Sequence, residues 1–250
     1  MKSETDPLGR IHSFVAEVWR ETGSSSEKFP KLFRKGDPKY PIPFFGNVRK
    51  AEIFTVGLNP SAGEFNNRGW HDGLSCELLT SRLLAYHSSS PHDWFGRWSD
   101  ALTLLIGSPS YAEGNVAHLD VSPRATQSFG SMDTEQAVQF QKMLRQDIGW
   151  LFQSIAMNTS LKLILMAGTA SHDCYLDRLV GECADLHSCK LAPKKSADGI
   201  QCRFWQLQGN GASIPVFFSG SSPSDRKNPK RLFDNVRANV ETLNAILVDV

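Results

Sequence analysis

Short apolar runs alternate along this chain with longer segments in which apolar residues recur at helical spacing. Each short run is too brief for a helix of ordinary length and has few polar interruptions, which is typical of a strand buried on both faces. Trp94–Ile106 and Asp133–Met157 lie between the runs and predict amphipathic helices. The four runs that predict strands are Ala51–Val56, Val116–Val121, Leu161–Ala167 and Ile214–Ser219.

The length of the connections predicts how these strands pair. Antiparallel neighbours need only a tight turn, whereas parallel neighbours need a long crossover, usually a helix. A parallel sheet is covered by helices on both faces. We therefore predict an α/β fold, a three-layer α/β/α sandwich with a central, mainly parallel four-stranded sheet.

The segments outside this core are less regular. Ile11–Thr22 has the apolar stripe of an amphipathic helix, and Asn235–Val248 predicts a last helix. Residues 23–43 mix Gly, Ser, Pro and basic residues, which favours a long loop, and residues 183–213 have no assignable pattern. A length of 250 residues suits one α/β domain over 1–250, with an N-terminal helix and loop in 1–45.

Composition narrows the function only slightly. The net charge of +1 gives no overall electrostatic reason to bind nucleic acid, so a local basic patch would have to supply one. No apolar stretch approaches eighteen residues, so we expect no membrane partner and a cytoplasmic, nucleoid-associated protein. We also expect a monomer. The five cysteines include no C-x-x-C pair, which argues against a disulfide framework, a zinc ribbon and an iron–sulfur cluster.

Two unusual loops follow the first and last predicted strands, Gly57–Phe65 and Ser219–Arg226. Ligands in open α/β sheets bind beyond the carboxyl ends of the strands, where both loops would lie. Gly57 would allow a close backbone approach, Pro60 would stiffen the turn, and Asn59 would place a carboxamide with donors and an acceptor there. The sequence thus predicts a rigid polar site at this edge.

Together the two loops resemble the signature motifs of the uracil-DNA glycosylase superfamily. In its mismatch-specific and single-strand-selective branches the first motif reads G-[IM]-N-P-G, which Gly57–Ser61 matches except at its last residue. The second motif reads N-P-S or H-P-S, and Ser222–Ser224 matches its last two positions. Trp94–Trp98 is similar to the aromatic start of a family helix, and Leu119–Thr126 to the family strand L-x-N-x-V-x-R-P-T. The resemblance covers roughly residues 50–240.

The resemblance implies a DNA glycosylase that flips a deaminated or altered base out of the duplex and hydrolyses its N-glycosidic bond. It also implies that no metal or organic cofactor is required. Asn59 would position the attacking water. Ser222, the second catalytic residue, would hold the phosphate or the developing base anion through its hydroxyl. Phe65 or Trp70 would stack on the base, although core packing is the alternative for either ring. The implied base-binding residues are Gly57, Leu58, Phe65, Trp70 and Asp120, and the implied DNA-phosphate contacts are Ser61, Ser224, Arg226 and Lys227.

Two positions depart from the family pattern and keep other functions open. Asp120 stands where the family has its uracil-reading asparagine, and Ser222 replaces a larger donor. An ionised carboxylate only accepts hydrogen bonds, so Asp120 would suit an edge with two adjacent donors, such as guanine-like N1–H and N2–H₂. The alternatives are a non-catalytic module that binds nucleic acid or a nucleobase, and a hydrolase of free nucleosides or nucleotides.

Overall fold

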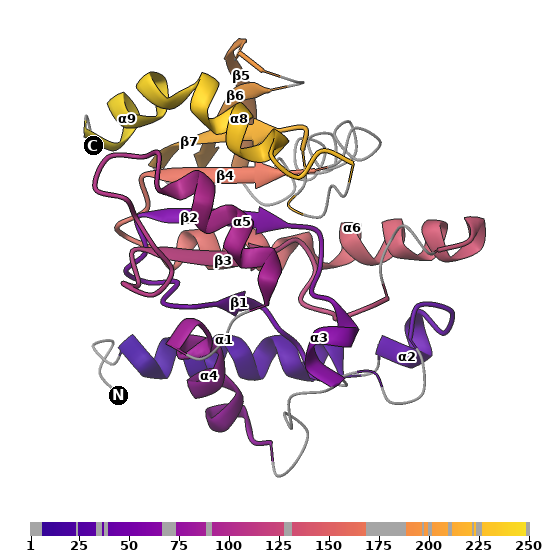
Figure 1. Ribbon diagram of the computed structural model, residues 1–250. Helices are drawn as coiled ribbons and strands as arrows, with labels where there is room; N and C mark the ends of the chain where they lie inside the picture. Colours follow the sequence, from indigo (N-terminus) through magenta and orange to yellow (C-terminus); the bar gives the residue numbers. More distant parts are fainter. Residues whose placement is uncertain are drawn as a thin grey trace.

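The computed structural model describes residues 7–23, 25–33, 37, 40–66, 74–88, 92–127, 132–168, 189–196, 198–199, 202–209, 212–221, 223 and 227–248. Within these residues seven strands form one mixed sheet in the order β1-β3-β2-β4-β7-β6-β5 (Figure 1). The strands are β1 (Phe44–Phe45), β2 (Ile53–Gly57), β3 (Val116–Asp120), β4 (Leu163–Ala167), β5 (Cys189–Ser196), β6 (Arg203–Gly209) and β7 (Ala212–Ser219).

The four strands predicted from apolar runs form the centre of the sheet. β3, β2, β4 and β7 are neighbours in that order and all run parallel. Every residue of β2, β3 and β4 is buried, in keeping with their mainly apolar sequences, and the buried polar residues among them are Thr55, His118 and Asp120. The predicted α/β class and the parallel pairing of these strands are confirmed.

The prediction of a four-stranded sheet is wrong, because strands are added at both edges. β1 pairs antiparallel with β3, while β6 and then β5 extend the sheet antiparallel beyond β7. A two-residue strand such as β1 is too short for a periodic signal. β5 contains a proline, two adjacent lysines and a register shift between Pro193 and Lys195, which obscure alternation in the sequence.

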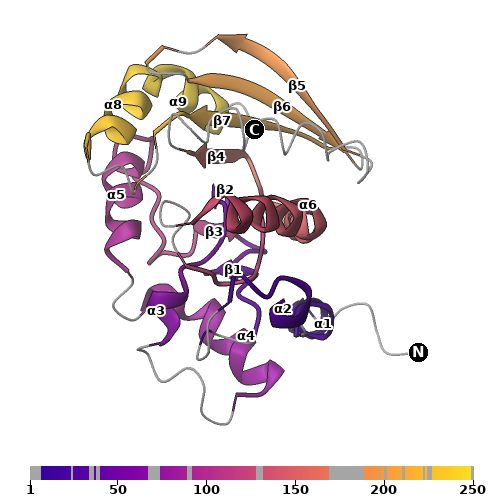
Figure 2. The same ribbon diagram turned by 90° about the vertical axis from the view of Figure 1, so that its right-hand side faces the viewer.

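Helices cover both faces of the sheet and its β1 edge. Figure 2 shows α5, α8 and α9 on one side of the central strands and α6 on the other, with α1 to α4 grouped beside β1. The helices are α1 (Pro7–Thr22), α2 (Ser25–Lys28), α3 (Ala62–Asn66), α4 (Cys76–Leu84), the 3₁₀ turn η1 (Tyr86–Ser88), α5 (Asp93–Leu102), α6 (Thr134–Ala156), α8 (Arg231–Ala238) and α9 (Val240–Val248).

Local sequence explains where these helices begin and end. Asp133 caps α6 through its side chain while Gln136 bonds back to the Asp133 amide, a reciprocal pair that satisfies two unpaired N–H groups. The apolar residues at helical spacing in this segment are buried, as predicted. The predicted last helix is instead two, because Asn239 ends α8 and its side chain bonds the carbonyls of Asn235 and Asp198.

The first predicted helix is confirmed within α1. Its apolar stripe packs against the core, with Val15 and Val18 fully buried and Trp19 partly buried. In the part of the chain that the structure describes, no helix combines the length and the apolar character needed to cross a membrane.

Candidate functional site

The candidate site lies where β2, β3 and β7 end. We name three loops there: the asparagine loop (58–62), the arginine loop (121–126) and the serine loop, described at 219–221 and 223. The first two continue the parallel pairing of their strands, since the amides of Val121 and Ser122 donate to the carbonyls of Gly57 and Leu58 at 3.1 and 3.0 Å. Farther on, Thr126 exchanges backbone hydrogen bonds with Pro60 and Ala62. The two loops therefore form one rigid unit rather than independent connections.

The arginine loop fixes the carboxamide of Asn59. Its Nδ2 donates to the carbonyls of Pro60 at 2.9 Å and Arg124 at 3.2 Å, and to the Thr126 hydroxyl at 2.8 Å. Carbonyl oxygens only accept, so the nitrogen must face them, and the orientation of the amide follows. Oδ1 takes part in none of the hydrogen bonds among the described residues and points away from these acceptors. An oriented acceptor is thus presented at the carboxyl edge of the sheet.

Asp120 ends β3 directly beside Gly57, its partner in the parallel register. A Cβ atom at Gly57 would come within 2.6 Å of Asp120 Oδ1, closer than real contacts allow. Only glycine fits there without displacing the carboxylate. Asp120 is 5% exposed, so this carboxyl group is placed by close packing at the end of the strand.

A buried chain of polar side chains leads to Asp120 from the interior. Tyr111 Oη lies 2.6 Å from Thr55 Oγ1, which lies 2.8 Å from His118 Nδ1. On the other side of the ring, His118 Nε2 faces Asp120 Oδ1 at 3.4 Å. Burial raises the pKa of Tyr111, so its hydroxyl keeps its proton and can donate. We name Tyr111, Thr55 and His118 the buried relay.

Aromatic rings enclose the imidazole of this relay. The ring centroids of Trp94, Phe95 and Phe45 lie 4.7, 5.3 and 5.6 Å from that of His118. Two of these rings come from the start of α5, whose first turn is capped by the His92 side chain. The packing excludes water from the relay and leaves few orientations for His118.

A buried ion pair fastens the arginine loop to α6. Arg124 Nε and Nη2 bond the two carboxylate oxygens of Asp147 at 2.7 and 3.2 Å, and Ser122 Oγ donates to the same group at 2.7 Å. The guanidinium also reaches the Thr22 carbonyl at the end of α1. Burial raises the pKa of Asp147, and the bonds from Arg124 and Ser122 oppose that rise. Contacts with α6 and with the end of α1 therefore hold the arginine loop, which in turn orients Asn59.

The serine loop is held by α8 and α5. Asn235 Nδ2 on α8 donates to Ser219 Oγ at 2.9 Å and to Ser221 Oγ at 3.4 Å, and all three side chains are buried. Arg97 on α5 donates to the carbonyl of Pro223. Side chains from two helices therefore support the second predicted motif, next to the carboxyl end of β4.

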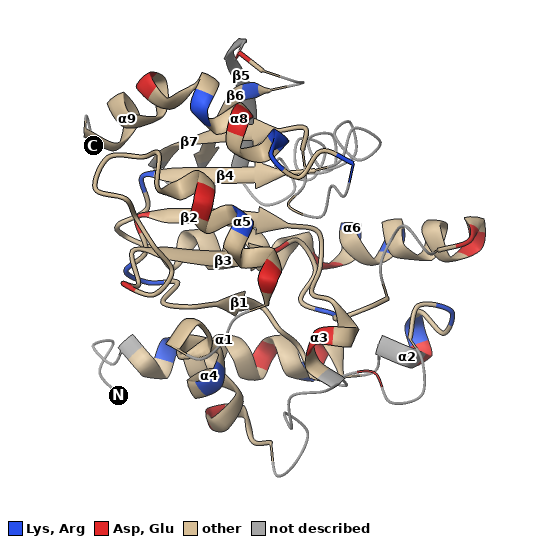
Figure 3. Cartoon of the chain, in the orientation of Figure 1, with Lys and Arg blue, Asp and Glu red and all other residues tan. Residues whose placement is uncertain are grey.

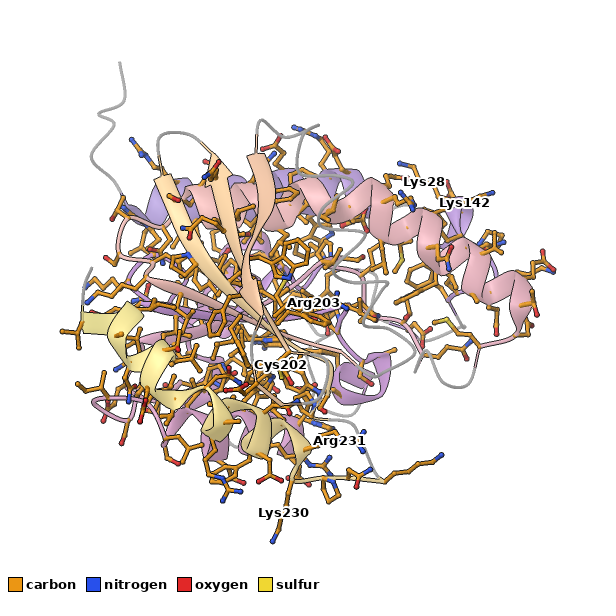
Figure 4. The ribbon with its side chains drawn as sticks, turned by 90° about the horizontal axis from the view of Figure 1, so that it is seen from above. Lys28, Lys142, Cys202, Arg203, Lys230 and Arg231 are labelled. Carbon is orange, nitrogen blue, oxygen red and sulfur yellow. The ribbon has the colours of Figure 1, made fainter. Side chains whose placement is uncertain are left out.

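Basic side chains gather around this edge of the sheet. Figure 3 shows basic positions near the start of α8 and on α2 and α6, the elements that flank the carboxyl ends of the strands. In Figure 4, Arg231 and Lys230 lie at one side of the edge, and Lys28 and Lys142 lie at the other. Lys28, Lys142, Lys227 and Lys230 are exposed. Acidic side chains occur on the same elements, among them Glu27 on α2 and Glu135 on α6, so the basic positions at this edge are interspersed with acidic ones.

Several predicted site residues come together here, and others lie elsewhere. Gly57, Leu58, Asn59, Ser61 and Asp120 lie on the asparagine loop or at the adjoining strand ends, and Lys227 is exposed beyond the serine loop. Phe65 is fully buried and packs against Phe45, so its ring offers no exposed face for a base, in agreement with the core-packing alternative. Trp70, Ser222, Ser224 and Arg226 lie outside the described residues.

The sequence alone did not single out the groups that support these residues. They are Thr55, Tyr111, His118, Arg124, Asp147, Asn235 and Arg97. One signal was available, since His118 lies two residues before Asp120 in a strand and therefore shares its face. The other partners are far away in sequence. Among the residues described, no group of three His, Cys, Asp or Glu side chains is placed to hold a metal ion.

No protein-family model matches this chain, and no curated protein matches its sequence. The resemblance to uracil-DNA glycosylases therefore rests on the loop motifs and remains a prediction.

Proposed function

We propose that this protein is a monofunctional DNA glycosylase with a uracil-DNA glycosylase-like core, in which β3, β2, β4 and β7 form the parallel sheet of a three-layer sandwich. It would act as a monomer in the cytoplasm, associated with the nucleoid, on a deaminated or otherwise altered base. The observation that carries the proposal is the fixed carboxamide of Asn59, whose nitrogen is tied to the arginine loop while its oxygen is left for a ligand.

The proposed reaction needs little from the protein beyond positioning and charge. Asn59 Oδ1 accepts a hydrogen bond from a water molecule, whose oxygen attacks C1′ of the flipped nucleotide. The bond between C1′ and the base breaks, and the departing base takes the electron pair and finally the proton of the water. An amide is a very weak base, so stabilisation of the cationic sugar by nearby negative charge supplies most of the rate. We expect slow turnover.

The charges around the site support DNA as the substrate. The exposed lysines Lys28, Lys142 and Lys230 lie on or next to helices that flank the carboxyl edge, and Lys227 is also exposed. Contacts from such side chains to phosphates position a duplex without reading its sequence, and they make affinity fall steeply with salt. Ser61, which is exposed on the asparagine loop, is also available for such a contact.

A non-catalytic binding module of the same fold is the second candidate. It is favoured by the chemistry of Ser222, since a short neutral hydroxyl replaces a donor that could neutralise a departing base. The small net charge of +1 leaves a hydrolase of free nucleosides or nucleotides as a third candidate.

Three measurements separate these candidates: base release from DNA, salt-dependent DNA binding and hydrolysis of free nucleosides. Labelled oligonucleotides that contain uracil, hypoxanthine, xanthine, 8-oxoguanine or a mismatched thymine are incubated with the protein and then cleaved with alkali at abasic sites. A glycosylase gives alkali-labile sites at one altered base. DNA binding that falls with salt, without any cleavage, identifies the binding module. Hydrolysis of free nucleosides without salt-sensitive DNA binding identifies the third candidate.

A further inference from the structure

We propose that His118 is a positioning residue that holds Asp120 as a hydrogen-bond acceptor, and that Asp120 thereby selects a base edge with adjacent N–H and amino donors, as in guanine-type bases. The inference rests on the proposed function, in which Asp120 contacts the flipped base. It adds the buried relay, which none of the motifs includes, and a class of substrate.

The direction of hydrogen bonding in the relay follows from its members. Tyr111 and Thr55 have one hydroxyl proton each, and the described hydrogen bond of Tyr111 is the one to Thr55. If Tyr111 donates to Thr55, then Thr55 donates to His118 Nδ1, and both protons are used. The opposite direction would leave the buried Tyr111 hydroxyl proton without an acceptor among the described residues. The relay therefore favours the imidazole tautomer with its proton on Nε2.

That tautomer places an N–H group beside Asp120. Nε2 lies 3.4 Å from Oδ1, and both side chains are almost completely buried. An Nε2–H group can donate to the carboxyl oxygen, whose other lone pairs remain as acceptors. With the other tautomer, two acceptors, the bare Nε2 and the carboxyl oxygen, would face each other. The direction of the relay and the role of Asp120 are thus linked.

Packing keeps the carboxylate in one place. Gly57 lies under Oδ1 with no room for a side chain, and the rings of Trp94, Phe95 and Phe45 hold the imidazole. The lone pairs that His118 does not use can accept side-by-side donors, such as N1–H and the 2-amino group of a guanine-type base. A carbonyl in place of that amino group would face the carboxylate oxygen with no proton between them. We expect a penalty of roughly 10- to 100-fold in affinity for the carbonyl analogue.

Binding to uncleavable DNA tests this inference separately from catalysis. The probes are oligonucleotides in which one 2′-fluoro nucleotide, resistant to hydrolysis, carries guanine, 8-oxoguanine, hypoxanthine, xanthine or uracil. Guanine and hypoxanthine differ only in the amino group, and xanthine has a carbonyl in its place. Fluorescence anisotropy gives Kd for the full chain and its variants, and the ¹⁵N shifts of the His118 ring report its tautomer.

Four variants test the inference, and two of them, His118→Phe and His118→Gln, form a matched pair. Asp120→Asn supplies both a donor and an acceptor, so it is expected to reverse the preference between guanine-type and xanthine probes. His118→Phe keeps an aromatic ring but removes the N–H group, and is expected to bring the preference close to 1. His118→Gln keeps a donor near Asp120 and should retain much of the preference. Thr55→Val breaks the relay and should raise the population of the Nδ1–H tautomer in the ¹⁵N spectrum.

The outcomes separate the inference from the proposed function. A preference of 10-fold or more for guanine-type probes, reversed in Asp120→Asn, supports the inference even if no base is ever released, in which case only the glycosylase proposal fails. Equal Kd values for all probes, an unchanged preference in Asp120→Asn, or a wild-type His118 protonated on Nδ1 overturns the inference, and base release by the same protein would leave the glycosylase proposal standing.

Discussion

Gly57 and Asp120 lie opposite each other at the ends of β2 and β3, and the space above the Gly57 Cα atom is filled by the carboxylate oxygen Oδ1. A Cβ atom there would be 2.6 Å from that oxygen. Glycine at position 57 therefore leaves the space that the buried carboxylate of Asp120 occupies.

Replacing Gly57 with alanine tests whether this space is required. We expect Gly57→Ala to displace Asp120, to lower the free energy of unfolding by about 1 to 3 kcal/mol, and to weaken base discrimination. Urea unfolding and binding of the base panel measure the two effects. Gly63→Ala is the matched control, since its added Cβ would meet only Ser61 Oγ at 3.8 Å. Equal effects of the two substitutions would contradict the account.

The orientation of Asn59 depends on Thr126, whose hydroxyl accepts a bond from Nδ2. We expect Thr126→Val to reduce the single-turnover rate of base release by roughly 5-fold, because a net hydrogen bond of about 1 kcal/mol that holds the amide is lost. Thr126→Ser keeps the hydroxyl and should retain the rate. Quenched-flow or manual-quench kinetics measure both variants. A valine variant as active as the serine variant would show that this bond does not orient Asn59.

The buried pair of Arg124 and Asp147 predicts a non-additive effect on stability. Removing one partner leaves a buried charge unpaired, so Arg124→Met and Asp147→Leu should each cost about 3 to 5 kcal/mol in the free energy of unfolding. The double variant should cost clearly less than the sum of the two, because it leaves neither charge. Equilibrium unfolding in urea completes this double-mutant cycle. Additive losses would mean that the two side chains contribute independently.

His87 predicts a pH dependence of stability. Burial lowers its pKa to about 4, with a smaller contribution in the same direction from His118. The unfolded chain, with an ordinary value near 6.5, then binds a proton in a window where the folded protein does not, so stability falls as pH drops from about 6.5 towards 4. Between pH 7.5 and 5 the loss from this group is about 2 kcal/mol.

The variant His87→Phe tests this contribution. A phenyl ring can replace the imidazole that stacks on Tyr111 at 4.4 Å between centroids, and it has no proton to bind. Urea unfolding at pH 7.5 and pH 5 should show a smaller loss in the variant than in the wild type. The same loss in both proteins would assign the pH dependence to other groups.

The sequence predicts the centre of this fold better than its edges. Leu163–Ala167 is apolar at every position and Val116–Asp120 is apolar except at His118 and Asp120, since helices cover both faces, and such runs are easy to identify. β5 and β6 pair antiparallel at an edge, where Pro193 and the lysines of β5 interrupt the pattern. Edge strands depend on their neighbours for pairing, and a single sequence does not show those neighbours.

The sequence likewise predicts some residues of the candidate site and misses the residues that support them. Asn59 and Asp120 were predicted because each lies on a short motif directly after or at the end of a strand. Their supporting groups Tyr111, Thr55 and Asp147 act through tertiary contacts, which span 56 positions from Thr55 to Tyr111, 63 from Thr55 to His118 and 23 from Arg124 to Asp147. Long-range partners of this kind are fixed by the fold as a whole, so short motifs give no sign of them.

The most direct test of the central claim is the single-turnover rate at which free base is released from the preferred oligonucleotide, measured by chromatography for the wild type and Asn59→Ala. If Asn59 Oδ1 positions the attacking water, the variant should lose roughly 100-fold or more of the rate, while DNA affinity stays within a few-fold of the wild-type value. Base release by Asn59→Ala at the wild-type rate would contradict the assignment of Asn59, and the absence of base release by the wild type from every altered base would contradict the glycosylase proposal itself.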